Sequence, residues 1–178
     1  AVLGLDDDKC EAICEAARKE GKKAWPVNYN TDGQLVLAGL KEDLASLEGE
    51  LKGAGAKRAL LLNMSVCSHC DILQNASQKL KAVLDTKLQN EFGFEIVSNA
   101  TAEKYKTKAK ALNLLEKQLI APVLYKQSIK KYEQEVEAFI EFGNGSVLSG
   151  LNKKTTSVPT YSVNSMASIA EIIEKIKG

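Results

Sequence analysis

The stretch Arg58-Ala-Leu-Leu-Leu-Asn-Met-Ser-Val-Cys-Ser-His69-Cys70 joins an apolar run to a short polar loop. The run from Ala59 to Leu62 has the length and composition of a buried strand, and small polar residues then interrupt it. Apolar residues at helical spacing follow the loop: Leu73, Ala76, Leu80, Val83 and Leu84. The stretch therefore predicts a strand, a loop and a helix that runs from Asp71 to about Asn90.

The loop contains His69, the only histidine among the 178 residues. Loops between a strand and a helix often hold reactive groups in α/β proteins, because rigid elements fix both of their ends. Imidazole is also the side chain best suited to moving protons near neutral pH. Three interpretations compete: a general base in acyl transfer, a Cys-x-x-Cys redox site at Cys67 and Cys70, and an ordinary packed histidine.

The residues before this loop predict a sheet of four strands. The expected order is strand, helix, strand, strand, helix, strand, and a turn at Asp32-Gly33 joins the two middle strands. The expected elements are Ala1–Leu5, a helix with Cys10, Ile13, Cys14 and Ala17 on its apolar face, Ala24–Tyr29, Gln34–Ala38, a helix from Leu40 to Ala54, and Arg58–Leu62. This order is that of the ferredoxin-like unit, with two helices on one face of an antiparallel sheet. We therefore predict a ferredoxin-like subdomain at residues 1–62.

The residues after the loop alternate between helices and strands, which predicts an α/β arrangement with parallel strands at residues 63–178. The strands expected here are Phe94–Val97, Val136–Phe142 and Pro159–Val163. Residues 103–110 are expected to form a polar, basic connection. The expected helices are Ala111–Ile120, one that carries Leu124 and Ile129, a brief one ending near Gly150, and a closing one that buries Ile169, Ile172, Ile173 and Ile176.

The composition favours a cytoplasmic protein that binds neither nucleic acid nor membrane. The 24 Lys and Arg residues nearly balance the 23 Asp and Glu residues, and no apolar run reaches membrane-spanning length. The first residues lack the pattern of a signal peptide. The four cysteines fit reduced thiols better than a secreted disulfide framework.

Two alternatives use the thiols of the loop. A thiol-disulfide oxidoreductase would use Cys67 and Cys70, and Val158-Pro159-Thr160 resembles the proline loop that faces thioredoxin-like redox sites. Such motifs, however, usually begin the helix itself, so we expect Cys67 and Cys70 to stay unbridged. A zinc site made of these cysteines, His69, Cys10 and Cys14 is less favoured, because Cys10 and Cys14 lie on an apolar helix face. We therefore expect no metal.

Several further blocks, in order along the chain, carry a resemblance to a known family. They are Val27-Asn-Tyr-Asn-Thr-Asp-Gly-Gln-Leu-Val-Leu-Ala-Gly39, Gly55-Ala-Lys-Arg-Ala59, Ser65-Val-Cys-Ser-His-Cys70, Ser98-Asn-Ala-Thr101, Lys117-Gln-Leu119 with Pro122-Val123, and Phe142-Gly-Asn-Gly-Ser-Val-Leu-Ser-Gly-Leu151. Together they resemble the malonyl-CoA:acyl carrier protein transacylases, acyltransferases of fatty acid biosynthesis. The resemblance covers essentially all 178 residues.

The resemblance implies a reaction and residues for it. In this family a serine on a G-H-S-x-G turn attacks malonyl-CoA, and the malonyl group then passes to the phosphopantetheine thiol of acyl carrier protein. The position that matches the family's base is His69, and the backbone carbonyl of Gln118 is implied to orient its ring. Asn30 and Asn99 match asparagines near the substrate pocket. No cofactor is implied beyond the two substrates.

The chain differs from the family pattern because three of the family's segments are absent from it. It contains no G-H-S-x-G, no G-Q-G-S-Q segment and no arginine-bearing helix after the serine. It therefore resembles the C-terminal portion of the enzyme, so that residues 63–178 correspond to part of an α/β hydrolase-like core. Alone, the chain is expected to be inactive, and a non-catalytic fragment that binds a partner is the alternative.

Two further expectations concern surfaces. Acyl carrier proteins are acidic as a family, so their docking surface here is expected to be basic, with Lys57, Arg58, Lys153 and Lys154 as candidates. Because the serine turn is absent, His69 is expected to face an open cleft with exposed apolar side chains around it.

Overall fold

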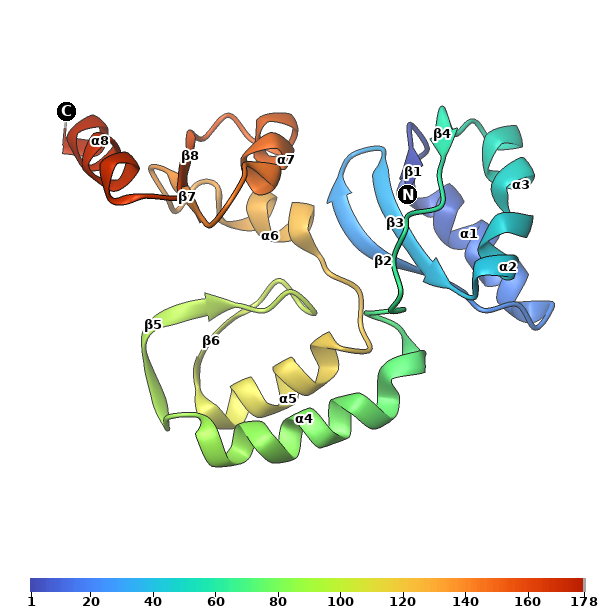
Figure 1. Ribbon diagram of the computed structural model, residues 1–178, viewed down its shortest axis with the longest axis horizontal. Helices are drawn as coiled ribbons and strands as arrows, with labels where there is room; N and C mark the ends of the chain where they lie inside the picture. Colours follow the sequence, from blue (N-terminus) through green and yellow to red (C-terminus); the bar gives the residue numbers. More distant parts are fainter. Residues whose placement is uncertain (178) are drawn as a thin grey trace. The chain divides into compact units, whose positions relative to one another are not determined.

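A computed structural model describes residues 1–177 (Figure 1). Helices and strands alternate, and the chain divides by its internal contacts into two compact units, Ala1–Ser128 and the residues from Ile129 onward. The protein is thus of the α/β class. No helix in the described range combines the length and the apolar composition that crossing a membrane requires.

The first unit contains a four-stranded sheet in the order β2-β3-β1-β4, with every neighbouring pair antiparallel. Its strands are β1 (Val2–Leu3), β2 (Ala24–Thr31), β3 (Gln34–Gly39) and β4 (Arg58–Ala59). The predicted antiparallel sheet is therefore confirmed. The tight turn between β2 and β3 places Gly33 at φ +70°, a conformation that glycine adopts without strain.

Helices cover one side of this sheet (Figure 1). Helix α1 (Asp7–Lys19) buries the predicted face of Cys10, Ile13, Cys14 and Ala17. The single helix predicted from Leu40 to Ala54 is wrong, because α2 (Lys41–Ser46) and α3 (Glu48–Gly53) are separate. The Leu47 N–H bonds to the Leu44 carbonyl, three residues back, which tightens the turn between them. Leu47 and Leu51 pack with α1 and with Leu35 of β3 in the core.

The strand predicted from Arg58 to Leu62 ends at Ala59. Strand β4 pairs with β1 as far as Val2 and Ala59, and Leu60 then exchanges two hydrogen bonds with Ala1, at 2.9 and 2.6 Å. The chain then runs without regular structure until Cys70, and its apolar side chains remain exposed.

Two helices and two strands complete the first unit. After a 3-10 turn at Asp71–Leu73 come α4 (Gln74–Lys87), β5 (Glu91–Val97), β6 (Lys104–Thr107) and α5 (Lys108–Gln118). The prediction that residues 103–110 form a polar connection is wrong. Strand β6 pairs antiparallel with β5, and Tyr105 is buried while Lys106 is exposed. Successive side chains of a strand point to opposite faces, so a strand with one covered face buries only alternate residues. The buried Tyr105 meets this requirement.

The second unit is built on a parallel pair of strands. Helix α6 (Tyr125–Tyr132) leads into β7 (Phe139–Phe142), α7 (Val147–Thr155), β8 (Thr160–Val163) and α8 (Met166–Lys177). The predicted parallel pairing holds for β7 and β8, whereas β5 and β6 are antiparallel. Helix α7 continues beyond Gly150, because Leu151 and Asn152 are buried. Of the four isoleucines expected to be buried in α8, Ile173 and Ile176 are exposed.

Candidate active site

His69 lies at the end of the irregular segment and is held by two consecutive carbonyl groups. Its backbone N–H donates to the Leu119 carbonyl at 3.0 Å, and its ring Nδ1 lies 2.7 Å from the Gln118 carbonyl oxygen. Its φ of +64° is in the left-handed region, which is uncommon for a residue with a side chain. The contact between His69 and Gln118 that the resemblance implied is therefore present.

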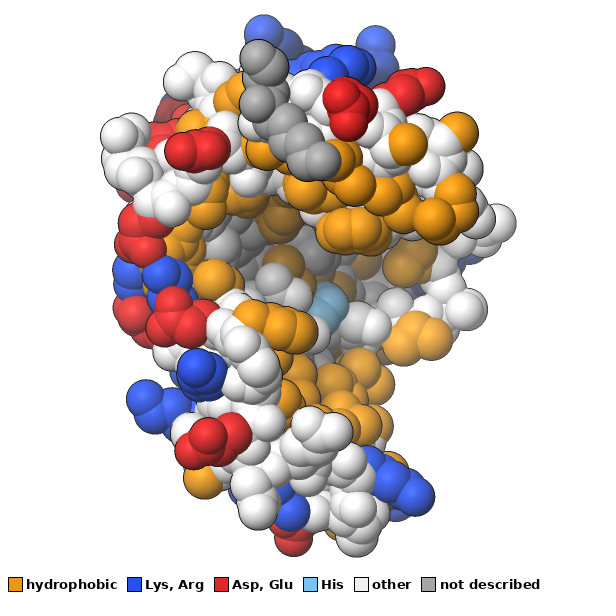
Figure 2. All heavy atoms as spheres, turned by 90° about the vertical axis from the view of Figure 1, so that its left-hand side faces the viewer, with side chains coloured by type: hydrophobic (Ala, Val, Ile, Leu, Met, Phe, Trp, Pro, Cys, Tyr) orange, Lys and Arg blue, Asp and Glu red, His pale blue; other side chains and the backbone are white. Residues whose placement is uncertain are grey.

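This contact determines where the proton of the neutral ring resides. A carbonyl oxygen only accepts, so Nδ1 must be the protonated nitrogen that donates to Gln118. The opposite nitrogen, Nε2, is then unprotonated and able to accept a proton. The ring is half-buried, and Figure 2 shows it in pale blue, open to view on this face of the molecule. This is the arrangement that a general base requires.

A groove of about 810 Å³ in the first unit has His69 among its lining residues. One wall is the irregular segment, and the other walls come from β3 and α2. Five large apolar side chains of the segment are at least 50% exposed: Leu60, Leu61, Leu62, Met64 and Val66. The expected exposed apolar surface beside His69 is therefore confirmed. We call residues 60–66 the apolar segment.

The thiols of Cys67 and Cys70 lie close together, and the pKa of Cys67 is raised. The Sγ atoms of Cys67 and Cys70 lie 3.3 Å apart, and both cysteines are free. Burial, together with the hydrogen bond and charge of Cys70, raises the pKa of Cys67 to about 12. A thiol with such a pKa stays protonated near neutral pH, so it is a poor nucleophile. The raised pKa of Cys67 therefore does not favour the oxidoreductase interpretation.

The zinc hypothesis finds no cluster to support it. Cys10 and Cys14 lie in the core of the first unit, where burial raises the pKa of Cys10 to about 11 and of Cys14 to about 12. Across residues 1–177, no three or more His, Cys, Asp or Glu side chains are grouped closely enough to hold a metal ion.

The other predicted residues are distributed over both units. Asn30 is half-buried in β2, and the Asn99 carbonyl accepts a hydrogen bond from the Leu124 N–H at 2.8 Å. Lys57 and Arg58 are exposed at β4 in the first unit, and Lys153 and Lys154 are exposed on α7 in the second. Among these predicted residues, all within the described range, a hydrogen bond joins His69 to Gln118.

The Leu119 carbonyl, and the segment of residues 119–126 that carries it, were not predicted from the sequence. These residues run from the end of α5 into the first turn of α6, and they bond to His69, to β2 and to Asn99. Pro122 marks a break between helices, but no local pattern indicates the long-range bonds. We call residues 119–126 the connector.

Comparison with known proteins identifies relatives over nearly the whole chain, although no family model matches. The malonyl CoA-acyl carrier protein transacylase of Escherichia coli K12 is 38% identical over 177 residues, which are 98% of this chain and 57% of the relative. That of Bacillus subtilis is 34% identical over 179 residues, 99% of this chain and 56% of the relative. The chain thus spans about 57% of the length of the curated relatives it matches.

Solved structures agree with these relatives. The malonyl-CoA:acyl carrier protein transacylase of Helicobacter pylori has a TM-score of 0.93 at 43% identity, over 99% of this chain and 56% of that one. A malonyl-transacylase in complex with a type II polyketide synthase acyl-carrier protein has a TM-score of 0.91 at 34% identity, over 98% of this chain and 57% of that one.

The fold and these likenesses define an α/β protein related to enzymes that transfer acyl groups. More particularly, the chain is homologous, over nearly all of its residues, to one part of the malonyl CoA-acyl carrier protein transacylases.

Proposed function

We propose that this chain supplies the general base for malonyl transfer from coenzyme A to the phosphopantetheine thiol of acyl carrier protein. The observation that carries the proposal is the 2.7 Å contact between His69 Nδ1 and the Gln118 carbonyl, which leaves Nε2 able to accept a proton. The relatives are named for this reaction, and the matched part of the chain includes His69 and Gln118.

In the first half of the proposed reaction, Nε2 takes the proton of a serine hydroxyl while its oxygen attacks the malonyl thioester carbon. The carbon–sulfur bond to coenzyme A then breaks, and the imidazolium returns the proton to the departing sulfur. In the second half, Nε2 takes a proton from the phosphopantetheine thiol, which attacks the malonyl-serine ester. The imidazolium then protonates the departing serine oxygen. The Gln118 carbonyl stabilises the imidazolium in both halves, because it accepts from Nδ1–H.

The chain's own residues account for only part of this reaction. The sequence contains no G-H-S-x-G, so the serine that His69 serves is not in such a turn within these 178 residues. We propose that the reaction uses no cofactor beyond its two substrates. Asn30 and Asn99 are proposed to lie near the bound substrate, and their support is the match to the family motifs.

The finer description of the fold is also a proposal. We propose that residues 1–62 are a ferredoxin-like subdomain, which the strand order β2-β3-β1-β4 supports. Residues 63–178 are proposed to be the C-terminal part of an α/β hydrolase-like core. The parallel pair β7 and β8, joined through α7, supports this assignment.

A second candidate function is that of a non-catalytic fragment that binds a partner protein. The exposed apolar segment favours it, because contiguous apolar surface often marks an interface. The two candidates differ in what they require of His69, since only the first needs its ring.

The test is a chimera in which this chain replaces the 177 matching residues of the Escherichia coli relative. We expect the chimera to transfer malonyl from malonyl-CoA to acyl carrier protein. His69→Ala should lower kcat by roughly 10²- to 10⁴-fold, the usual scale for a general base. The KM for malonyl-CoA should change little, because the ring acts on the proton and not on binding.

Ser68→Ala is the matched control, since Ser68 neighbours His69 and also lines the groove. It should leave kcat within a few-fold of the unsubstituted chimera. An active chimera in which His69→Ala keeps its full kcat would contradict the proposed base and favour the partner-binding candidate.

A further inference from the structure

The connector is attached to His69 at its beginning. The Gln118 carbonyl, one residue before the connector, accepts from the His69 ring, and the Leu119 carbonyl accepts from the His69 backbone. The position of the ring therefore depends on where residues 118 and 119 lie. These residues end helix α5, which the connector joins to α6.

In its middle, the connector is attached to the edge of the four-stranded sheet. Val123 forms a parallel bridge beside Asn28 of β2. Its N–H donates to the Val27 carbonyl at 2.8 Å, and its carbonyl accepts from the Tyr29 N–H at 3.0 Å. Pro122 precedes this bridge, and its ring restricts the backbone there. The connector thus has little freedom between His69 and the sheet.

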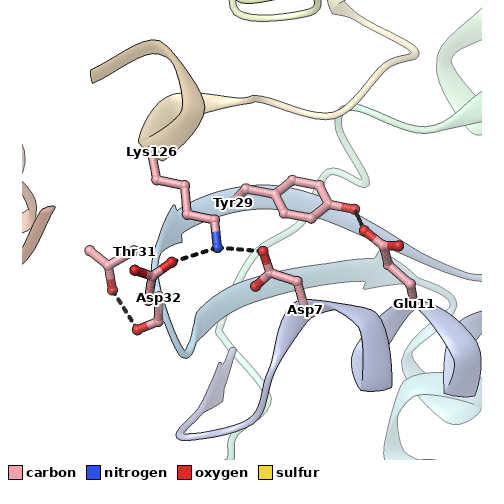
Figure 3. Close-up of polar contacts among 6 residues, drawn as sticks. All are labelled: Asp7, Glu11, Tyr29, Thr31, Asp32 and Lys126. Atoms are coloured by element: carbon pink, nitrogen blue, oxygen red, sulfur yellow. Dashed lines mark hydrogen bonds and ion pairs between the residues drawn. The ribbon is translucent and has the colours of Figure 1, made fainter. Parts of the chain in front are cut away.

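The end of the connector is attached by two ion pairs of Lys126. Lys126 Nζ lies 2.5 Å from an Asp7 carboxylate oxygen and 3.0 Å from one of Asp32 (Figure 3). Asp7 begins α1, and Asp32 lies in the turn between β2 and β3. The Lys126 and Asp7 side chains are only 13% and 15% exposed, whereas Asp32 is 68% exposed. One ammonium group therefore joins three separate segments of the first unit.

The Lys126–Asp7 pair is the stronger of the two attachments. Solvent screens the exposed Asp32 pair, but the Asp7 pair is largely shielded from water. Burial alone would lower the pKa of Lys126, yet hydrogen bonds and attraction from Asp7 and Asp32 outweigh it and raise this pKa. Removing the ammonium would leave the shielded Asp7 carboxylate uncompensated, which is more costly than losing an exposed pair.

We propose that Lys126 is a positioning residue for His69. Its ion pairs hold the end of the connector on the sheet, and the connector in turn keeps the Gln118 carbonyl at hydrogen-bond distance from Nδ1. The catalytic part of this inference rests on the proposed function, because a general base needs the tautomer that the Gln118 carbonyl selects. Lys126 itself touches none of the reacting atoms.

The experiment observes the only histidine ring of the chain by ¹⁵N NMR, with amide hydrogen exchange as the second measurement. The variant is Lys126→Met, which keeps the aliphatic stem and removes the charge. We expect the Nδ1–H signal of the bonded ring to weaken and the ¹⁵N shifts to approach those of a free imidazole. The amides of His69 and Val123 should exchange about tenfold faster relative to that of Leu35 in β3.

Lys126→Arg should restore the wild-type spectrum in large part, because it keeps a cation at the same place. The matched control is Lys19→Met, which removes another lysine of an ion pair, 2.8 Å from Glu15 on the surface of α1. It should change neither the ring signals nor the relative exchange rates. If Lys126→Met does not fold, Asp32→Asn removes the exposed pair alone and should give a smaller change of the same kind.

A folded Lys126→Met variant with unchanged ring signals and exchange rates would overturn the inference. So would a loss of the ring contact in the Lys19→Met control, because the effect would then be unspecific. In the active chimera, Lys126→Met should also lower kcat more than it raises KM. These NMR results do not depend on activity: if His69→Ala leaves the chimera active, the proposed function fails, while the dependence of the ring on Lys126 is still measured.

Discussion

At the scale of single residues, the Gln118 carbonyl determines which ring nitrogen of His69 can accept a proton. The Gln118 carbonyl accepts only, so it assigns the proton of the neutral ring to Nδ1 and leaves Nε2 able to accept a proton. The positive φ of His69 brings its ring and its backbone N–H to two consecutive carbonyls. A conformation that is uncommon for histidine is thus offset by two hydrogen bonds.

The thiol of Cys67, two residues before His69, leads to a prediction about its rate of alkylation. With a pKa of about 12, only a fraction on the order of 10⁻⁴ of Cys67 is thiolate at pH 8. We therefore expect iodoacetamide to alkylate native Cys67 at least about 100-fold more slowly than the same cysteine in the denatured chain. Mass spectrometry of timed digests measures the rate at each cysteine.

Cys70→Ser is the control, because the Cys70 thiol contributes to the raised pKa of Cys67. It should speed alkylation of Cys67 without reaching the rate of the denatured chain, since burial remains. Native Cys67 that reacts as fast as the denatured cysteine would show that its thiol is activated, and the oxidoreductase interpretation would regain support.

At the scale of an element, a carboxylate on one strand caps the helix that follows it. Glu141 of β7 accepts hydrogen bonds from the backbone N–H groups of Leu148 and Ser149 at 2.9 and 2.8 Å. It also accepts from the hydroxyls of Ser149 and Ser162, at 2.6 and 3.3 Å. The Ser149 hydroxyl contributes most, and together these donors lower the pKa of Glu141 from 4.5 to about 2.

The lowered pKa predicts an acid-dependent contribution to stability. Because the folded pKa lies below the unfolded one, the contribution is fully present above pH 4.5 and is lost as pH falls toward 2. Glu141→Gln should lower the denaturation midpoint at pH 7 and should flatten its pH dependence between 5 and 2. Amide exchange of the first turn of α7, followed over this range, measures the effect locally.

Glu137→Gln is the matched control, because Glu137 is exposed and lies two residues before β7. It should leave the α7 amides unchanged at pH 7. Equal effects of the two substitutions would mean that overall charge, and not the cap on α7, sets the acid response.

At the scale of the whole molecule, the charged residues that we expect to contact acyl carrier protein come from both units. Lys57 and Arg58 follow α3, whereas Lys153 and Lys154 are in the last turn of α7. If they form the docking surface, the Kd for acyl carrier protein should rise several-fold between low and physiological salt, because salt screens exposed charges. The double charge reversal Arg58→Glu with Lys153→Glu should weaken binding further and remove most of the salt dependence.

Calorimetry or fluorescence anisotropy with phosphopantetheinylated carrier protein measures this affinity. Lys87→Glu, at the exposed end of α4, is the control for net charge and should have a smaller effect. Unchanged affinity after the double reversal would exclude these residues from the docking surface.

Local chemistry alone predicted much of the architecture. The face of α1, the turn at Gly33 and the four-stranded sheet follow from the spacing of apolar residues and from turn residues, which act over a few neighbours. The His69–Gln118 contact was predictable only through the resemblance, because nothing near Gln118 in the sequence singles it out.

Other features were decided by tertiary structure. Strand β6 reads as a connection in the sequence, but it pairs with β5 in the structure. Strand formation depends on a neighbour that the local sequence does not contain. Lys126 and Asp32 are 94 residues apart, yet they meet because the connector bonds to β2. Side-chain periodicity is a property of neighbouring residues, whereas an ion pair between residues far apart in the sequence exists only once the chain has folded.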